Sequence, residues 1–340
     1  MKYLKPLIII AILGFTGLFL YATDWEKVVL SLQRVGYYFI LLLLISFTSY
    51  FLGTVAWRYC MGSDGKRIPL AELFIIRHIG ETVGIVNPTS IVAGEAVKVY
   101  LLRNHNIEKK TVITSVLLSR MVMMLTQVIV FIPTALYVLF NTDSLVPDFN
   151  NVSKALFIVL LTGLCITGVI KLRRQIKMLL KAWFGIYATR RTIKLRNTIH
   201  EALFELSLFF KTNKKALAFS VIFFLLHWII GSLEFFVILK LLEVTVSFIP
   251  VIFADMSVIL FKSAGAFVPA QIGIEEYGNK VMLATIGITA LEVWVTASIL
   301  RRARQLFWIA FGLGAYFFIG RKKESLLPQT DVESSLSSIK

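Results

Sequence analysis

The chain has 340 residues, 57% of them hydrophobic, and a formal net charge of +16 at pH 7. This hydrophobic content excludes an ordinary soluble domain and is typical of an integral membrane protein. Much of the excess charge gathers at 171–215, where twelve lysines and arginines stand against two glutamates. We expect this stretch to be a cytoplasmic loop that could also bind anionic head groups, and we expect no nucleic-acid binding. The two cysteines and four histidines fall in no metal-binding or catalytic pattern, so we predict no metal, no cofactor and no catalytic residue.

The N-terminal segment at 2–22 begins with a lysine and continues as an apolar run. Its cleavage site is poor, so we expect an uncleaved first span. The helical segments expected after it are apolar enough to cross or enter a membrane. They lie at 38–57, 70–95, 108–140, 154–171, 216–240, 251–274, 277–287 and 290–320. Gly and Pro interrupt the segments at 70–95 and 251–274, and these two could be re-entrant or could cross fully.

The predicted fold class is therefore all-α, a polytopic membrane protein with about six full spans and two broken or re-entrant segments. We divide the chain into N-terminal spans, a first repeat with a broken segment and a long arginine-bearing helix, a span with the basic loop, a second repeat, and a disordered tail. Their bounds are 1–57, 58–140, 141–215, 216–320 and 321–340.

The two interrupted segments repeat one another, because residues 82–95 align with residues 263–276 at a separation of 181. The matched pairs are Gly84 and Gly265, Pro88 and Pro269, Glu95 and Glu276, and, further along, Arg120 and Arg301. Three expected crossings separate the two copies. If each copy enters and leaves on one side, the second is inverted relative to the first, as in many transporters. If just one of them crosses fully, the inversion is lost. The residues expected at the breaks are Gly84, Pro88, Gly94, Gly265, Pro269 and Gly273.

Charged residues within apolar segments are candidate functional residues, because a charge at membrane depth is costly unless it is paired or lines a wet cavity. Arg120 lies well inside its long helix, and arginine is suited to holding a phosphate through parallel hydrogen bonds. The candidate substrate-binding residues are Arg77, Glu81, Glu95, Lys98, Arg120, Glu275, Glu276, Arg301 and Arg302.

Simpler interpretations stay open for these residues. Arg120 could extend its head group to the interface, and the charges near the breaks could form only a local ion-pair network. Glu276 precedes Lys280 by four residues, so this pair could be a surface bridge that leaves Glu275 as the freer carboxylate. His227 and Glu234 share a helical face and could relay protons, although an ordinary interhelical hydrogen bond is the commoner arrangement.

The order of these motifs resembles the lysylphosphatidylglycerol synthase transmembrane family, also called flippase-like membrane proteins, and is most similar to its hopanoid-biosynthesis-associated subgroup. The resemblance covers about residues 5–320. Its motifs are Gly94-Glu95-x-x-Lys98, Ser119-Arg120, Pro269-x-x-x-Gly273-x-Glu275 and Arg301-Arg302-Ala303-Arg304. It implies a lipid-translocating membrane protein whose first motif set includes Gly94, Glu95, Lys98 and Arg120, and whose second includes Pro269, Gly273, Glu275 and Arg302.

Two departures from the family pattern point to a cargo other than aminoacylated lipid. Ser119 stands where the family often has Glu, and Pro269-Ala-Gln-Ile-Gly273 replaces a glycine-rich sequence. No soluble aminoacyl-transferase domain follows the spans, so we expect no synthase activity.

We therefore predict a lipid flippase of the inner membrane and not an enzyme, with both termini cytoplasmic. Its expected partners are membrane lipids with anionic or zwitterionic head groups, and it could associate with itself or with lipid-synthesis enzymes. The alternatives are a membrane-embedded transferase that acts on a lipid-linked substrate and a scaffold that transports nothing.

Overall fold

A computed structural model describes residues 35–86, 90–102, 107–141, 212–264 and 273–324, together with the single residues 26, 30, 33, 105, 209 and 271. The regular elements of this part of the chain are helices. In chain order they are α3 (Tyr38–Cys60), the 3-10 helix η1 (Gly62–Arg67), α4 (Leu70–Val86), α5 (Ser90–Leu102), α6 (Lys109–Asn141), α9 (Lys214–Leu241), α10 (Phe248–Ala264), α11 (Ile274–Thr285) and α12 (Leu291–Glu324).

The long helices lie close to the bounds predicted from their apolar runs, and they are α3, α6, α9 and α12. Among the described helices, α3, α6 and α9 are long and apolar enough to cross a membrane. The predicted spans at 2–22 and 154–171 and nearly all of the basic loop lie outside the described residues. Helix α12 continues to Glu324, past residue 320, where the last helix was predicted to end, and residues 325–340 of the predicted tail lie outside the described residues.

Each interrupted segment contains the end of one helix and the start of another. Helix α4 ends at Val86 and α5 begins at Ser90, while α10 ends at Ala264 and α11 begins at Ile274. Pro88, Gly265 and Pro269 lie outside the described residues. Gly273 precedes α11 with φ +81°, a left-handed conformation that favours glycine.

Gly84 and Gly94 do not lie at the breaks as predicted, because both are within helices. Gly94 instead lets two helices approach closely. A Cβ atom placed on Gly94 would collide with the backbone carbonyl of Gly80, so α4 and α5 contact one another through their main chains. The first interrupted segment is thus a tightly packed pair of helices.

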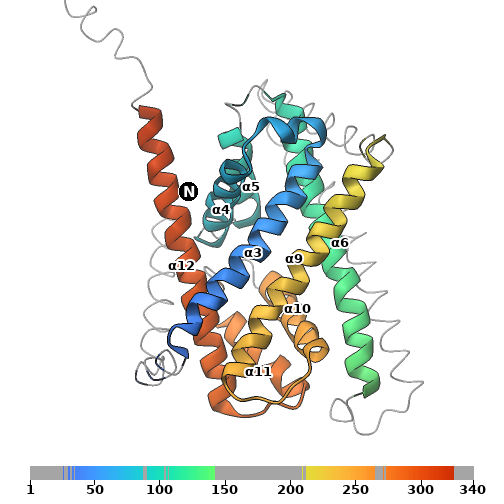
Figure 1. The fold of residues 1–340 in the computed structure, drawn as a ribbon, viewed down its shortest axis with the longest axis vertical. Helices are drawn as coiled ribbons and strands as arrows, with labels where there is room; N and C mark the ends of the chain where they lie inside the picture. The colour runs from blue at the N-terminus through green and yellow to red at the C-terminus, as the bar shows by residue number, and fades with distance from the viewer. Residues whose placement is uncertain are drawn as a thin grey trace, which may run out of the picture.

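Figure 1 shows how the helices are arranged: α3 and α9 pack side by side and run in opposite directions. The α4–α5 pair lies toward one end of the bundle and the α10–α11 pair toward the other. Helix α6 packs against α9 and α10, while α12 packs against α4 and α11. Each interrupted segment therefore contacts the long helix that belongs to the other half of the chain.

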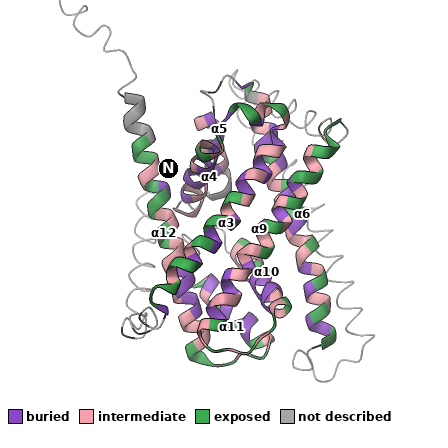
Figure 2. Cartoon of the chain, in the orientation of Figure 1, coloured by how far each residue is buried: buried purple, intermediate pink, exposed green. Residues whose placement is uncertain are grey.

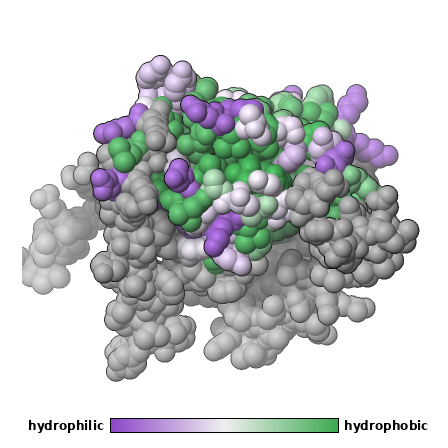
Figure 3. Space-filling model, turned by 90° about the horizontal axis from the view of Figure 1, so that it is seen from below, coloured by the Kyte–Doolittle hydropathy of each residue, from purple (hydrophilic) through white to green (hydrophobic). Residues whose placement is uncertain are grey.

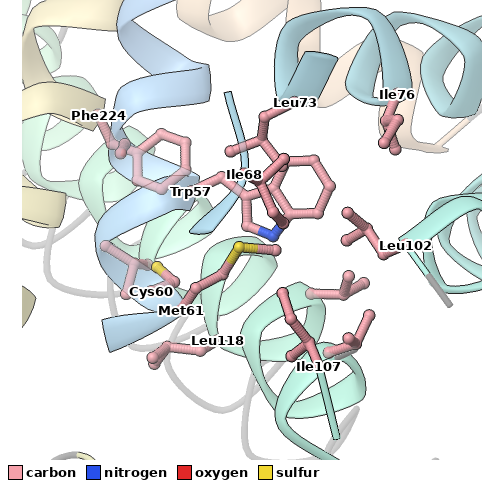
Figure 4. Packing of buried hydrophobic residues seen from close by; sticks show 14 residues of the cluster. Trp57, Cys60, Met61, Ile68, Leu73, Ile76, Leu102, Ile107, Leu118 and Phe224 are labelled. Atoms are coloured by element: carbon pink, nitrogen blue, oxygen red, sulfur yellow. The ribbon is translucent and has the colours of Figure 1, made fainter. Parts of the chain in front are cut away.

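Two apolar cores stabilise the two ends of the bundle. The first surrounds Trp57 and includes Leu73 and Phe224, as Figure 4 shows, and the second includes Phe235 and Leu283. Large hydrophobic side chains also remain exposed on the outer sides of the helices, where Figure 2 shows exposed residues along α3, α6 and α12. Such an apolar exterior suits a bilayer, where it contacts lipid chains. Figure 3 shows one end of the bundle from below, where hydrophilic residues lie among the hydrophobic ones of the described part.

Candidate functional site

A first ionic cluster forms where α4, α5 and α6 meet, and it unites five of the predicted site residues. Its members are Arg77 and Glu81 on α4, Glu95 and Lys98 on α5, and Arg120 on α6. The Lys98 Nζ atom lies 3.3 Å from a carboxylate oxygen of Glu81 and 3.3 Å from one of Glu95. The Arg120 Nη2 atom lies 3.4 Å from Glu95. The Arg120 side chain therefore points toward the α4–α5 pair, and it does not simply extend to the membrane–water interface.

These charged side chains line a pocket together with apolar ones. The lining residues are Trp57, Arg77, Glu81, Glu95, Lys98, Val116, Ser119, Arg120, Met123 and Phe224. Its enclosed space holds about one water molecule, so this conformation is too closed for a lipid head group. The Glu81 side chain is 40% exposed, which leaves one side of the cluster accessible.

The guanidinium of Arg77 is held in place by α3. Its Nη1 atom donates a hydrogen bond of 2.8 Å to the Tyr50 carbonyl oxygen, and its Nε atom lies 3.8 Å from Glu81. Gly53, one turn further along α3, leaves the space that this guanidinium occupies, because a Cβ atom there would collide with it. The buried charge of Arg77 is thus stabilised by a carbonyl dipole and by a carboxylate.

A second ionic cluster forms where α9, α10, α11 and α12 meet. Its members are Glu234, Asp255, Lys262, Glu275, Glu276, Arg301, Arg302 and Arg304. Arg301 lies 2.6 Å from Asp255 and 3.5 Å from Glu275, which also contacts Lys262 at 2.9 Å. The guanidinium of Arg301 also stacks over the Phe235 ring, 4.5 Å from its centroid.

Glu276 has two partners that the sequence did not indicate. One of its oxygens lies 2.5 Å from Nη2 of Arg302, and the other accepts a hydrogen bond from the Gly273 backbone N–H. Lys280, the predicted partner of Glu276, instead lies over the Trp294 ring. Glu275 is only 3% exposed and bonded to two cations, so the expectation that it is the freer carboxylate is wrong.

Arg304 joins the second cluster to the centre of the bundle. Its Nε atom lies 2.6 Å from Glu234 on α9, and its Nη1 atom donates a hydrogen bond of 2.7 Å to the Tyr50 hydroxyl on α3. Tyr50 therefore contacts Arg304 through its side chain and Arg77 through its carbonyl, which makes it a direct link between the two clusters.

His227 and Glu234 do not contact one another as a relay would require. His227 forms hydrogen bonds with the hydroxyl and the carbonyl of Ser49 across the α3–α9 interface. Glu234 pairs with Arg304 instead. The ordinary interhelical hydrogen bond, the commoner of the two interpretations, is what His227 makes.

Comparison with known protein families shows which family the chain belongs to. The profile described as "Lysylphosphatidylglycerol synthase TM region" matches residues 4–314. The chain belongs to this family. Comparisons with curated proteins and with solved structures gave no match.

In this member of the lysylphosphatidylglycerol synthase TM family, the motifs that carried the resemblance lie in the two ionic clusters. Glu95, Lys98 and Arg120 belong to the first, and Glu275 and Arg302 belong to the second. The charged residues of the two motif sets therefore lie at two separate places in the bundle of this chain.

Sequence reasoning missed Asp255, a member of the second cluster, and Tyr50, which links the two clusters. Asp255 is a buried carboxylate in an otherwise apolar segment, and it accepts from both Arg301 and Ser232. Its position among apolar residues was itself a signal, because such a charge is costly without partners. Tyr50 gave no signal, since a tyrosine within a span is ordinary. Among the described residues, no group of three or more histidines, cysteines, aspartates or glutamates is placed to hold a metal ion.

Proposed function

We propose that the protein moves a phospholipid or a related polar lipid between the two leaflets of the cell's inner membrane. The observation that carries the proposal is the pair of ionic clusters in the bundle. Each cluster joins an interrupted segment to a long helix, and Tyr50 contacts both, through Arg77 in the first and Arg304 in the second. A charge within a membrane segment is a functional-site hypothesis by default, and eight charged residues in one cluster exceed what anchoring needs.

The order of the helices supports an inverted repeat. Helices α3 to α6 correspond in sequence to α9 to α12, and the separation of 181 residues places each helix of one half on its counterpart. The two interrupted segments lie toward opposite ends of the bundle. Paired, oppositely oriented segments around a central site are the architecture by which many transporters open alternately to the two sides.

Within this proposal, the first ionic cluster faces the cytoplasmic leaflet and the second faces the outer leaflet. The lysines before the N-terminal apolar run and the basic loop favour cytoplasmic termini by the positive-inside rule. A head group would enter the pocket beside Arg120 when α5 and α6 separate, and it would leave past Arg301 and Arg302 when the second cluster opens.

The proposed activity is transport and not chemical conversion. The cargo is a lipid with an anionic or zwitterionic head group, and hopanoids belong among the candidates because of the subgroup that the motifs resemble. Self-association, or association with lipid-synthesis enzymes, would fit such a carrier.

The proposal is tested with purified protein in vesicles that contain fluorescent lipids differing only in the head group. A membrane-impermeant reductant quenches outer-leaflet fluorophores, so the second phase of quenching measures translocation. The proposal expects a faster second phase for at least one polar lipid than in protein-free vesicles. Equal rates for every head group would contradict it.

A further inference from the structure

The two ionic clusters differ in how closely their charges are paired. In the first cluster the four cation–carboxylate distances run from 3.3 to 3.8 Å. In the second, four of the five distances run from 2.5 to 2.9 Å and one is 3.5 Å. Charge-assisted hydrogen bonds between an N–H and a carboxylate are about 2.7–2.9 Å long, so most ion pairs of the second cluster are tighter than those of the first. The close contact between Nε of Arg304 and Glu234 is an ion pair without hydrogen-bond geometry.

The clusters also differ in net charge. The first combines three cations, Arg77, Lys98 and Arg120, with the carboxylates of Glu81 and Glu95, so among the described residues one positive charge is uncompensated. The second combines four cations with four carboxylates and is neutral. An uncompensated charge in a partly buried pocket favours binding of a counter-ion.

Two groups that line the pocket have buried donors without a hydrogen-bond partner among the described residues, Nε of Arg120 and Nε1 of Trp57. Arg120 is the charged one of the two, and its outer nitrogen is ion-paired with Glu95. A guanidinium offers five N–H groups in a plane and can hold two oxygens at once. The Lys98 ammonium lies nearby, shared between two carboxylates and 5.7 Å above the Trp57 ring.

We propose that the pocket of the first cluster selects a head group with one uncompensated negative charge, namely a phosphodiester without an amine. Two phosphate oxygens would bind Arg120 and Lys98 beside Glu95, and the occupied first cluster, which keeps both of its glutamates, would then be neutral, as the second already is. A lysyl ester of phosphatidylglycerol, with two ammonium groups and one phosphate, is net positive and is a poor fit. The inference rests on the proposed function in one respect, which is that the ligand is a lipid.

The test measures binding and not transport, so that the two proposals can fail separately. Purified protein in a non-ionic detergent is titrated with dihexanoylphosphatidylglycerol, dihexanoylphosphatidylcholine and lysylated dihexanoylphosphatidylglycerol by isothermal titration calorimetry. The expected result is that the anionic lipid binds at least about tenfold more tightly than either other lipid. Equal affinities, or tighter binding of the lysylated lipid, would overturn the inference whether or not vesicles show translocation.

The same titration with glycerophosphoglycerol and with inorganic phosphate distinguishes a lipid site from a free-phosphate site. The inference expects glycerophosphoglycerol to compete with the short-chain anionic lipid, because both carry the same phosphodiester. If inorganic phosphate binds while the anionic lipid does not, the pocket is a free-phosphate site and the assignment to a lipid falls.

Two matched carboxylate variants make the test independent of misfolding. Glu95→Gln removes a carboxylate that competes with the ligand for Arg120, so it is expected to tighten binding of the anionic lipid by about tenfold, a gain that a misfolded protein cannot give. Glu292→Gln changes an exposed glutamate in the first turn of α12, outside both clusters, and is expected to leave that affinity within about twofold. If Glu292→Gln tightens binding as much as Glu95→Gln, the charge of the first cluster is not what selects the ligand. Arg120→Gln is expected to weaken binding by about tenfold, and unchanged affinity in this variant would also overturn the inference.

Discussion

The Nη1 atom of Arg304 on α12 lies 2.7 Å from the hydroxyl of Tyr50 on α3, and the carbonyl of the same tyrosine accepts a hydrogen bond from Arg77 on α4. One residue is thus bonded to both ionic clusters. Because Tyr50 lies near the middle of α3, a change in either cluster can reach the other through a single residue, by its hydroxyl on one side and its backbone carbonyl on the other. Coupling between two sites needs a shared element of this kind.

Tyr50→Phe is expected to slow lipid translocation by about fivefold, because it removes the hydrogen bond to Arg304 while keeping the ring and the carbonyl that accepts from Arg77. The measurement is the translocation rate in vesicles, with elution volume in gel filtration as the check on folding. Ser46→Ala is the matched control, because it removes another hydrogen bond between α3 and α12, from Trp308, outside the clusters. An equal loss in both variants would mean that general contact between the helices matters and not the link through Tyr50.

Asp255→Asn is expected to destabilise the protein strongly. The change removes the charge that Arg301 contacts at 2.6 Å, and breaking one side of a buried pair costs about 3–5 kcal/mol. The midpoint of thermal unfolding in detergent should fall by several degrees. Glu292→Gln, at an exposed position in the first turn of α12, should leave the midpoint nearly unchanged. An unchanged midpoint in Asp255→Asn would show that the second cluster does not stabilise the fold.

Gly94→Ala is expected to separate α4 from α5. The added methyl group would meet the Gly80 carbonyl, and overpacking of this kind costs about 1–3 kcal/mol. Gly314→Ala is the control, because a Cβ atom there meets nothing within 4 Å and alanine is the better helix former. Thermal unfolding should therefore occur at lower temperature in the first variant and at the same or higher temperature in the second. The reverse order would contradict the close main-chain contact.

The orientation of the two halves can be tested with single cysteines in a chain whose Cys60 and Cys165 are replaced by alanine. Ser63→Cys follows α3 and Thr289→Cys precedes α12, and both positions are exposed. An inverted repeat with cytoplasmic termini expects an impermeant thiol reagent to label the first only from the cytoplasmic side and the second only from outside. Labelling of both from one side would rule out the inverted arrangement.

The sequence predicted the helices better than it predicted their contacts. The bounds of α3, α6, α9 and α12 follow from runs of apolar residues that must satisfy their backbone groups within a bilayer, so length and composition suffice. The interruptions were visible as Gly and Pro, although Gly94 serves helix packing and not the break.

The partners of the charged residues depend on how helices that are distant in sequence pack together. The spacing of residues along one helix carries no information about that packing. The separation of four residues between Glu276 and Lys280 suggested a pair, yet Arg302 on the next helix is the closer partner. Arg77 and Glu81 have the same spacing and do form a pair. Their closest distance is as long as 3.8 Å, because Tyr50 also binds Arg77 and Lys98 also binds Glu81. The sequence placed Glu81, Glu95, Lys98 and Arg120 in the first repeat. It did not predict that their side chains line one pocket.

The central claim is that the pocket beside Arg120 receives the lipid that the protein translocates, and one comparison tests it most directly. Wild-type protein, Arg120→Ala and the surface variant Arg67→Ala are reconstituted at equal density, and translocation of fluorescent phosphatidylglycerol is followed by quenching. Arg67 is exposed and pairs only with the nearby Asp64 among the described contacts, so its loss should leave the rate unchanged. We expect Arg120→Ala to lower the rate by at least about tenfold in folded protein. A wild-type rate in Arg120→Ala would contradict the account.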